Sequence, residues 1–367
     1  MPDNRTDAYG TTGVKTNVVG DALKRLRNVL ASNTPSGARG KPVEDLTYFA
    51  GVVDVGFPEY IAISTDSVGT KALVAQMADK YDTIGIDCIA MNVNDVICVG
   101  ATPVSIVDYI ALEEPDPEFV EALAKGLAVG ACESQAPISG GEIAQVGEIV
   151  KGVRSGRAFD LAATCVGLVP KDRVINGAVV TPGDVILGLS STGLHSNGYS
   201  LARKVVFDKM GFQTDSYVDA LGKTIGEELL TPTHIYVQEV LKMLNEGLPI
   251  KALINITGDG LLNLNRVAAR NVGFRIDSLP EPSAIFPLLQ EWGGLSDAEM
   301  YRVFNMGIGF CVVVPEDSRA VDRVAEIAAE RGVDCQRIGT IVRDDAKRVF
   351  VTQKGLVQDG LYFKEGS

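Results

Sequence analysis

The sequence is poor in histidine and tryptophan, and its cysteines are not paired. Two histidines and one tryptophan occur among 367 residues, and the six cysteines form no C-x-x-C pair. Most of the cysteines lie in apolar runs, so we expect buried, reduced thiols rather than zinc ligands or disulfides. No uncharged stretch reaches the roughly 20 residues of a membrane helix, and the N-terminus lacks the apolar core of a signal peptide. We therefore expect a cytoplasmic protein without a membrane partner.

Positive charge is also scarce. Lysine and arginine number 34 against 47 aspartates and glutamates, which gives a net charge of −13. A negative field repels a phosphate backbone, so nucleic acid is not an expected partner. A small phosphorylated ligand stays possible, because backbone N–H groups, a few cations and bound Mg²⁺ reverse the potential locally.

The composition is that of a globular enzyme large enough for two domains. The chain is 46% hydrophobic and 22% charged, which is ordinary globular usage, and its length exceeds what one core usually organises. The pattern changes near 169–172, so we expect a β-rich domain over 1–170 and an α/β domain over 171–367. The expected strands are 49–55, 60–65, 104–111, one near 137, 159–168, 185–189, 252–257, 310–314 and 348–352. The main expected helices are 83–99, 115–133, 199–209, 233–245 and 318–331.

A glycine turn follows the apolar strand that ends at Ser64. Its sequence is Asp66-Ser67-Val68-Gly69-Thr70-Lys71. The glycine permits close backbone approach to a phosphate, the lysine neutralises it, and an aspartate at a strand end can hold Mg²⁺. The turn is not a P-loop, because G-x-x-x-x-G-K-[ST] is absent. Taken alone, such a turn is more often an ordinary exposed loop.

The helix expected over 83–99 carries polar residues inside an apolar pattern. Asp87, Met91 and Asp95 follow one another at intervals of four residues, and Asn94 adjoins Asp95, so two carboxylates and an amide point broadly one way. Either the carboxylates are buried, and then need a counter-charge, or this face is exposed to water. The sequence leaves both interpretations open.

Two further connections could carry ligand-binding residues. Ser139-Gly140-Gly141-Glu142 could offer Glu142 as a metal ligand, although a simple hairpin turn is the commoner meaning of paired glycines. The segment 190–200 joins a buried strand to a helix and contains His195 and Asn197, and such connections often hold ligands. A lone histidine is more often a structural hydrogen-bonding group than a catalyst, so both roles stay open for His195.

In this order, the segments resemble the phosphoribosylformylglycinamidine cyclo-ligase (aminoimidazole ribonucleotide synthetase) family. The matching strings are 65–71, 81–95, 100–103, 139–142, 194–200, 231–236, 257–260 and 300–309. Eight collinear strings are specific where one is weak. The resemblance implies an α/β (α+β) fold in which a β-rich N-terminal domain pairs with its copy in a barrel-like homodimer core and an α/β domain follows.

The resemblance also implies an activity and a set of site residues. In this family ATP activates the formyl oxygen of formylglycinamidine ribonucleotide, the amidine nitrogen attacks, and aminoimidazole ribonucleotide, ADP and phosphate are formed, which is a step of purine biosynthesis. Carried over by position, the catalytic residues would be His195, Lys71 and Asp66, the ATP-binding residues Gly69, Thr70, Lys71, Asn94 and Asn197, and the Mg²⁺ ligands Asp66, Asp95 and Glu142.

The sequence departs from the family pattern in three places, and these keep alternatives open. Lys15 stands where an aspartate is usual, the segment after Glu142 differs, and Asp259 interrupts a glycine run. The alternatives are another ATP-using member of the superfamily, such as a thiamine-monophosphate kinase or selenophosphate synthetase type, or a nucleotide-binding dimer without catalysis. The absence of a reactive cysteine near a glycine-rich N-terminus argues against selenophosphate synthesis.

Overall fold

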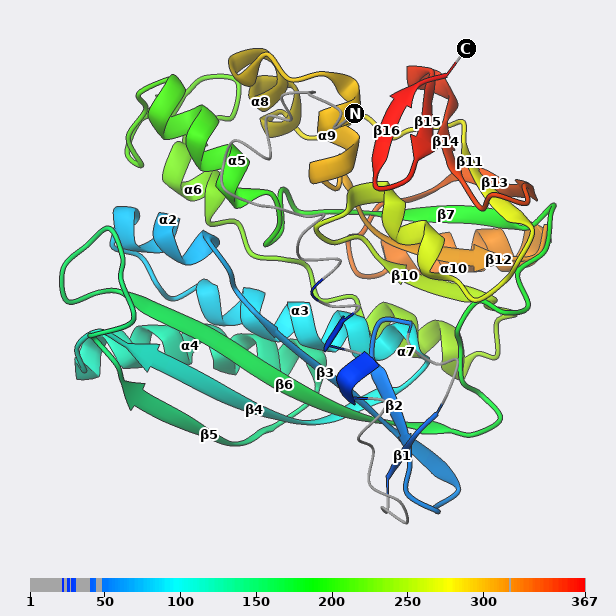
Figure 1. Ribbon diagram of the computed structural model, residues 1–367, viewed down its shortest axis with the longest axis horizontal. Coiled ribbons are helices and arrows are strands. Elements are labelled where there is room, and N and C mark those ends of the chain that lie inside the picture. The colour runs from blue at the N-terminus through cyan, green and yellow to red at the C-terminus, as the bar shows by residue number, and fades with distance from the viewer. Residues whose placement is uncertain are drawn as a thin grey trace.

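The computed structural model describes residues 22, 25, 26, 28–30, 40–43, 48–316 and 318–366. The segment around Lys15 lies outside these residues. Two sheets organise the described chain, one in each half, with helices packed between and around them (Figure 1). None of the described helices is long and apolar enough to cross a membrane.

The first sheet has six strands in the order β1-β2-β3-β6-β4-β5, and only β4 and β5 run parallel. Its strands are β1 (Lys41–Pro42), β2 (Gly51–Asp54), β3 (Glu59–Ser67), β4 (Thr102–Leu112), β5 (Ile138–Gln145) and β6 (Phe159–Pro170). The sequence predicted β2, β3, β4 and β6 to within a few residues. The hairpin turn considered for residues 139–142 is wrong, because these residues continue strand β5.

Helices α3 (Ile84–Cys98) and α4 (Pro117–Ser134) cover one face of this sheet (Figure 1). Helix α4 begins where the Asp116 carboxylate accepts hydrogen bonds from two backbone N–H groups of its first turn. The two helices approach closely because Gly85 faces the backbone of α4, where a Cβ would lie 2.1 Å from the nitrogen of Leu127. Both helices confirm the sequence prediction.

The second sheet has eight strands in the order β10-β12-β7-β13-β11-β14-β15-β16. They are β7 (Val185–Ser190), β10 (Ala252–Asn255), β11 (Val272–Ile276), β12 (Ile308–Val314), β13 (Cys335–Arg343), β14 (Val349–Val351), β15 (Leu356–Asp359) and β16 (Tyr362–Glu365). A separate small ribbon is formed by β8 (Tyr217–Val218) and β9 (Lys223–Thr224). Strands β7, β10 and β12 are buried along almost their whole length, which explains their continuous apolar sequences.

The remaining helices surround the two sheets (Figure 1). They are α2 (Lys71–Ala78), α5 (Tyr199–Arg203), α6 (Ile225–Leu229), α7 (Val237–Asn245), α8 (Ile285–Gly293), α9 (Asp297–Val303) and α10 (Ser318–Ala329), with a π-helix at Lys204–Lys209 and 3-10 helices at Gly260–Arg266 and Thr352–Lys354. The helix predicted over 199–209 is therefore α5 followed by the π-helix, and the helix predicted over 233–245 begins only at Val237.

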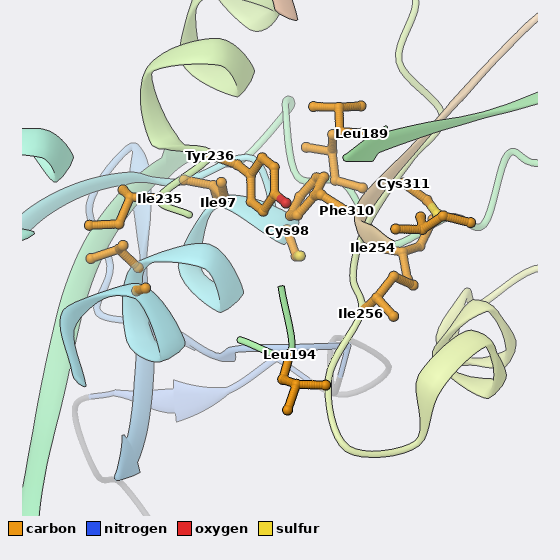
Figure 2. Packing of buried hydrophobic residues seen from close by; sticks show 14 of the residues in the cluster. Ile97, Cys98, Leu189, Leu194, Ile235, Tyr236, Ile254, Ile256, Phe310 and Cys311 are labelled. Carbon is orange, nitrogen blue, oxygen red and sulfur yellow. The ribbon is translucent and has the colours of Figure 1, made fainter. Parts of the chain in front are cut away.

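Helix α3 is the element shared by both halves. One side packs on β3 and β6, and the opposite side contacts β10 and α7 of the second half. Figure 2 shows the apolar part of this junction, where Ile97 and Cys98 of α3 approach Tyr236 and Phe310. Because α3 is enclosed from two directions, its polar residues cannot face open water along their length. The solvent-facing interpretation of this helix is therefore wrong.

Candidate functional site

The glycine turn lies at the N-terminus of α2. Gly69 has φ +57° and is exposed, and a Cβ placed there would have nothing within 4 Å. Thr70 precedes the helix, and its Oγ1 lies 3.3 Å from Oγ of Ser200 in α5. The starts of α2 and α5 thus meet across the boundary between the two halves. Helix N-termini favour anions, because their first N–H groups have no partner inside the helix.

Asp66, three residues before Gly69, and Asp95 of α3 carry perturbed pKa values. Asp66 is the last residue but one of β3 and is exposed, whereas Asp95 of α3 is half-buried and accepts a hydrogen bond from Asn255 at 2.9 Å. Burial raises the pKa of Asp95 to about 7, and the charge of Asp66 adds to the rise. Partial desolvation raises the pKa of Asp66 as well, and the Arg266 guanidinium opposes both shifts. The two carboxylates therefore form an electrostatically unsatisfied pair.

This pair fits a divalent cation that other groups help to hold. Among the described residues, no group of three histidine, cysteine, aspartate or glutamate side chains could hold a metal ion. Asp66 and Asp95 would supply two oxygen ligands, and a phosphorylated ligand and water would complete the shell, as is usual for Mg²⁺. A cation beside them would favour their ionised forms, which burial disfavours.

Glu142 does not join this pair. The register matches Asp66 with Ala163, Ala163 with Asp108, and Asp108 with Gly141, so these four residues share the face covered by α3. The next residue, Glu142, points to the opposite face, because side chains alternate along a strand. The register within one chain therefore does not place Glu142 beside Asp66, and its role as a third metal ligand stays a prediction.

Lys71 is not placed to cradle a phosphate. Its side chain has no exposed surface, and its Nζ lies 2.8 and 2.9 Å from the Asp87 carboxylate oxygens, 3.1 Å from the His195 carbonyl and 2.7 Å from the Thr231 carbonyl. Burial lowers the pKa of Lys71 and the Asp87 carboxylate opposes this shift. The three donors of the ammonium group are matched by these oxygens. The buried lysine therefore links the first half of the chain to two backbone carbonyls of the second half.

Asn94 and His195 are likewise occupied by protein partners. Asn94 is 1% exposed; its amide donates to the His234 carbonyl at 2.9 Å and accepts from the Tyr236 N–H at 3.0 Å. His195 is 3% exposed, and its Nε2 accepts from the Thr192 N–H at 3.2 Å. Burial lowers the pKa of His195 to about 3, so the ring is neutral. Both residues hold the framework, and the structure leaves neither free to contact a nucleotide or substrate.

Asn197 lies beside a second loop of the second half. It is half-buried, and its Oδ1 would lie 3.3 Å from a Cβ placed at Gly258, so it borders the loop 257–260. Asp259 of that loop lies 3.9 Å from the guanidinium of Arg266. The segments predicted at 65–71, 94–95, 194–200 and 257–260 therefore converge from both halves of the chain.

Sequence reasoning missed three residues that the fold brings to this place. Asn255 supports Asp95, Arg266 opposes the pKa shifts of both carboxylates, and Thr233 donates its N–H and hydroxyl to Asp87 at 2.8 and 2.6 Å. No local spacing links them to their partners, because the partners lie 146 or more residues away along the chain. The one local signal was the position of Arg266 at the end of the segment that follows the loop 257–260.

Comparison with known proteins identifies the relatives of the chain. Two models of the AIR synthase related protein family match it, the N-terminal domain over residues 49–169 and the C-terminal domain over residues 181–352. The phosphoribosylformylglycinamidine cyclo-ligase of Methanothermobacter thermautotrophicus is 48% identical over 284 residues, which covers 77% of this chain and 81% of the relative. The chain belongs to the phosphoribosylformylglycinamidine cyclo-ligase family. The members of this family are enzymes that form a carbon–nitrogen bond.

The cyclo-ligase family shares its fold with more distant solved structures. The thiamine-monophosphate kinase from Stenotrophomonas maltophilia superposes with a TM-score of 0.59 at 20% identity and covers 89% of this chain and 95% of its own. The T. maritima PurL complexed with ADP superposes with a TM-score of 0.54 at 17% identity, over 84% of this chain and 44% of its own. At such identities the likeness extends to the fold alone.

Proposed function

We propose that this cyclo-ligase uses ATP to convert formylglycinamidine ribonucleotide into aminoimidazole ribonucleotide, with release of ADP and phosphate, in purine biosynthesis. The observation that carries the proposal is the convergence of the carboxylates of Asp66 and Asp95, the turn at Gly69 and Thr70, and the loop bearing Asn197. The name of the 48% identical relative supports it over the kinase and selenophosphate synthetase alternatives. The ADP complex of the PurL neighbour adds support for the nucleotide.

The turn at Gly69 and Thr70 is the proposed place of the ATP phosphates. The exposed glycine leaves room for a phosphate to approach the backbone, and the Thr70 and Ser200 hydroxyls supply donors from the two halves. The N-terminus of α2 adds a favourable dipole. Lys71 contributes to this place only through the position that it gives to the turn, because its ammonium is buried.

Asp66 and Asp95 are the proposed Mg²⁺ ligands. When bound there, Mg²⁺ would neutralise charge on the phosphate oxygens and orient the group that is transferred. The chain itself orients the two carboxylates: that of Asp66 accepts from the Ser67 N–H at 2.8 Å, and that of Asp95 accepts from the Asn255 amide at 2.9 Å. Fixed ligands reduce the reorganisation that accompanies transfer.

Asn197 and the loop 257–260 are proposed to face the second substrate. Ring closure needs the amidine nitrogen held near the activated carbon, and positioning of this kind can supply a large part of a rate enhancement. An amide side chain beside a glycine loop offers both a donor and an acceptor at close range. His195 would act here through the shape of the loop, since its ring is enclosed.

We also propose that the protein is a homodimer built on the open face of the first sheet. Ile63, Val107 and Tyr109 lie on the face opposite α3 and are 38%, 43% and 43% exposed. An apolar sheet face open to water favours association, and a second copy would cover it with the same side chains. A charge introduced by Val107→Arg should convert a dimer into a monomer in sedimentation experiments, and an unchanged mass would contradict this assembly.

The activity can be tested directly. Purified protein with formylglycinamidine ribonucleotide, ATP and Mg²⁺ should release one ADP for each aminoimidazole ribonucleotide formed. Thiamine monophosphate in place of the ribonucleotide should give no ADP, whereas phosphorylation of that compound would favour the kinase. Binding of ATP without turnover would favour a nucleotide-binding dimer. A cytoplasmic location belongs to the proposal, because the six free cysteines suit a reducing compartment.

A further inference from the structure

The ion pair of Lys71 and Asp87 is buried at the centre of the molecule and is not explained by ligand binding. Both side chains have no exposed surface. Besides Asp87, the ammonium of Lys71 contacts the backbone carbonyls of His195 and Thr231, at 3.1 and 2.7 Å. These carbonyls belong to two separate loops of the second half, residues 190–198 and 231–236. One cation from the first half therefore holds two loops of the second half.

The carboxylate of Asp87 contacts the same two loops. Its Oδ1 accepts from the Thr233 N–H at 2.8 Å, from the Thr233 hydroxyl at 2.6 Å and from the Ser196 hydroxyl at 3.1 Å. The Ser196 and Thr233 hydroxyls also lie 3.1 Å from each other, which joins the loops directly. Each member of the ion pair thus contacts both loops, and the four segments form one hydrogen-bonded unit.

The energetics of such a pair favour a role in geometry. Two charges lose their hydration when they are buried, and an apolar pair of similar volume is often as stable or more stable. Hydrogen bonds to fixed carbonyls and hydroxyls require one arrangement of the loops, whereas apolar packing tolerates several. The pair at Lys71 and Asp87 is therefore suited to select one loop arrangement.

We propose that Lys71 and Asp87 are positioning residues whose ion pair clamps loops 190–198 and 231–236 against the start of α2. The clamp fixes Asn197 opposite the turn at Gly69 and Thr70, so the phosphate side and the substrate side of the site are assembled before a ligand binds. The consequence for turnover rests on the proposed function. The clamp itself does not depend on the proposed function, because it concerns only whether the two loops are held in one conformation.

The first test measures loop order without a substrate. Amide hydrogen exchange is compared in the wild type, Lys71→Met, Asp87→Asn and the control Lys80→Met, which removes an exposed lysine of the same region that is paired with Asp82. In the first two variants we expect at least tenfold faster exchange in both loops, with strand β6 unchanged. Wild-type exchange rates in both loops of both variants would overturn the clamp. The control should match the wild type.

The second test separates positioning from phosphate contact. For Lys71→Met we expect kcat/KM for formylglycinamidine ribonucleotide to fall at least 100-fold, while the Kd for Mg²⁺-ADP stays within threefold of the wild type. A Kd raised tenfold or more with unchanged loop exchange would show that the lysine contacts the phosphates, and would overturn the proposal. A wild type without turnover would refute the proposed function and leave the exchange result to decide on the clamp.

A third variant covers the case in which the single substitutions do not fold. The double variant Lys71→Met/Asp87→Leu removes both charges together, so no unpaired charge stays buried. We expect it to fold and still to exchange at least tenfold faster in both loops than the wild type. A folded double variant with loops as protected as in the wild type would overturn the proposal, because apolar packing would then order them equally well.

Discussion

Helix α3 carries an aspartate near each end, Asp87 and Asp95, and the two carboxylates differ in how many protein groups compensate their charge. Near the first end, Asp87 is completely buried, paired with Lys71 and supplied with hydrogen bonds by Ser196 and Thr233. Near the other end, Asp95 has one hydrogen-bond partner among the described residues, Asn255, and burial raises its pKa to about 7. A buried carboxylate with a counter-charge and several donors stabilises the framework, whereas a desolvated carboxylate without them is of the kind often found at ligand sites.

The largest expected effect is a loss of stability when the carboxylate of Asp87 is removed. Asp87→Ala leaves the Lys71 ammonium buried without its counter-charge, which costs about 3–5 kcal/mol of unfolding free energy. Urea unfolding followed by circular dichroism measures this loss. A loss below about 1 kcal/mol would mean that the carboxylate is not an essential partner of the lysine, and the contrast between the two ends would disappear.

The next largest effect is a loss of activity when the charge of Asp95 is removed. Asp95→Asn keeps the shape and the contact with Asn255 but removes a charge that would hold Mg²⁺. We expect ADP release to fall about 10³-fold, since metal neutralisation of phosphate charge contributes several kcal/mol to the transition state. The urea midpoint should not fall, because a desolvated charge is lost. Full activity in this variant would remove Asp95 from the metal site.

The raised pKa of Asp95 also predicts a dependence of stability on pH. The folded pKa of about 7 lies above the unfolded value of about 3.9. The folded state therefore binds more protons between these values, and its stability decreases as the pH rises through this window. Urea midpoints at pH 5, 6 and 7 should decline in the wild type and decline less in Asp95→Asn. Equal slopes in both proteins would assign the dependence to other groups.

The smallest effect is expected from an exposed ion pair. Lys80 and Asp82 lie 2.8 Å apart, but their side chains are 48% and 49% exposed. Lys80→Met should change the free energy of unfolding by less than about 1 kcal/mol, because water and salt screen such pairs. A loss comparable with that of Asp87→Ala would show that burial does not account for the difference between the two lysines.

Much of the first half could be predicted from the sequence. Helices α3 and α4 and strands β3 and β6 have long, consistent apolar patterns, and their limits were found to within a few residues. Strands β11, β13, β15 and β16 were missed, since their patterns are short or mixed and are completed by neighbouring strands. The assignment of residues 139–142 failed for a related reason, because paired glycines are typical of turns and yet can pair beside a partner such as β4.

The sequence predicted several individual residues of the site, but not the contacts that join them. Asp66, Gly69, Asp95 and Asn197 were chosen from local motifs, and the fold brings their segments together. Lys71 was expected to meet a phosphate because a lysine after a glycine turn often does, but no local pattern shows that Asp87 lies behind it. A buried polar network joins residues that are far apart in the sequence, so short-range spacing carries no information about it.

By itself the sequence determined the family, the apolar periodicities and the segments in which the chemistry resides, because these depend on residue types at fixed local spacing. The tertiary structure alone decided which polar side chains are saturated and which remain available. That distinction depends on the second half of the chain, whose loops supply hydrogen bonds to Asp87 and Asn94, whereas Asp95 accepts from Asn255 at the end of β10. Burial and hydrogen-bond partners depend on tertiary packing, which brings together residues that are distant in the sequence.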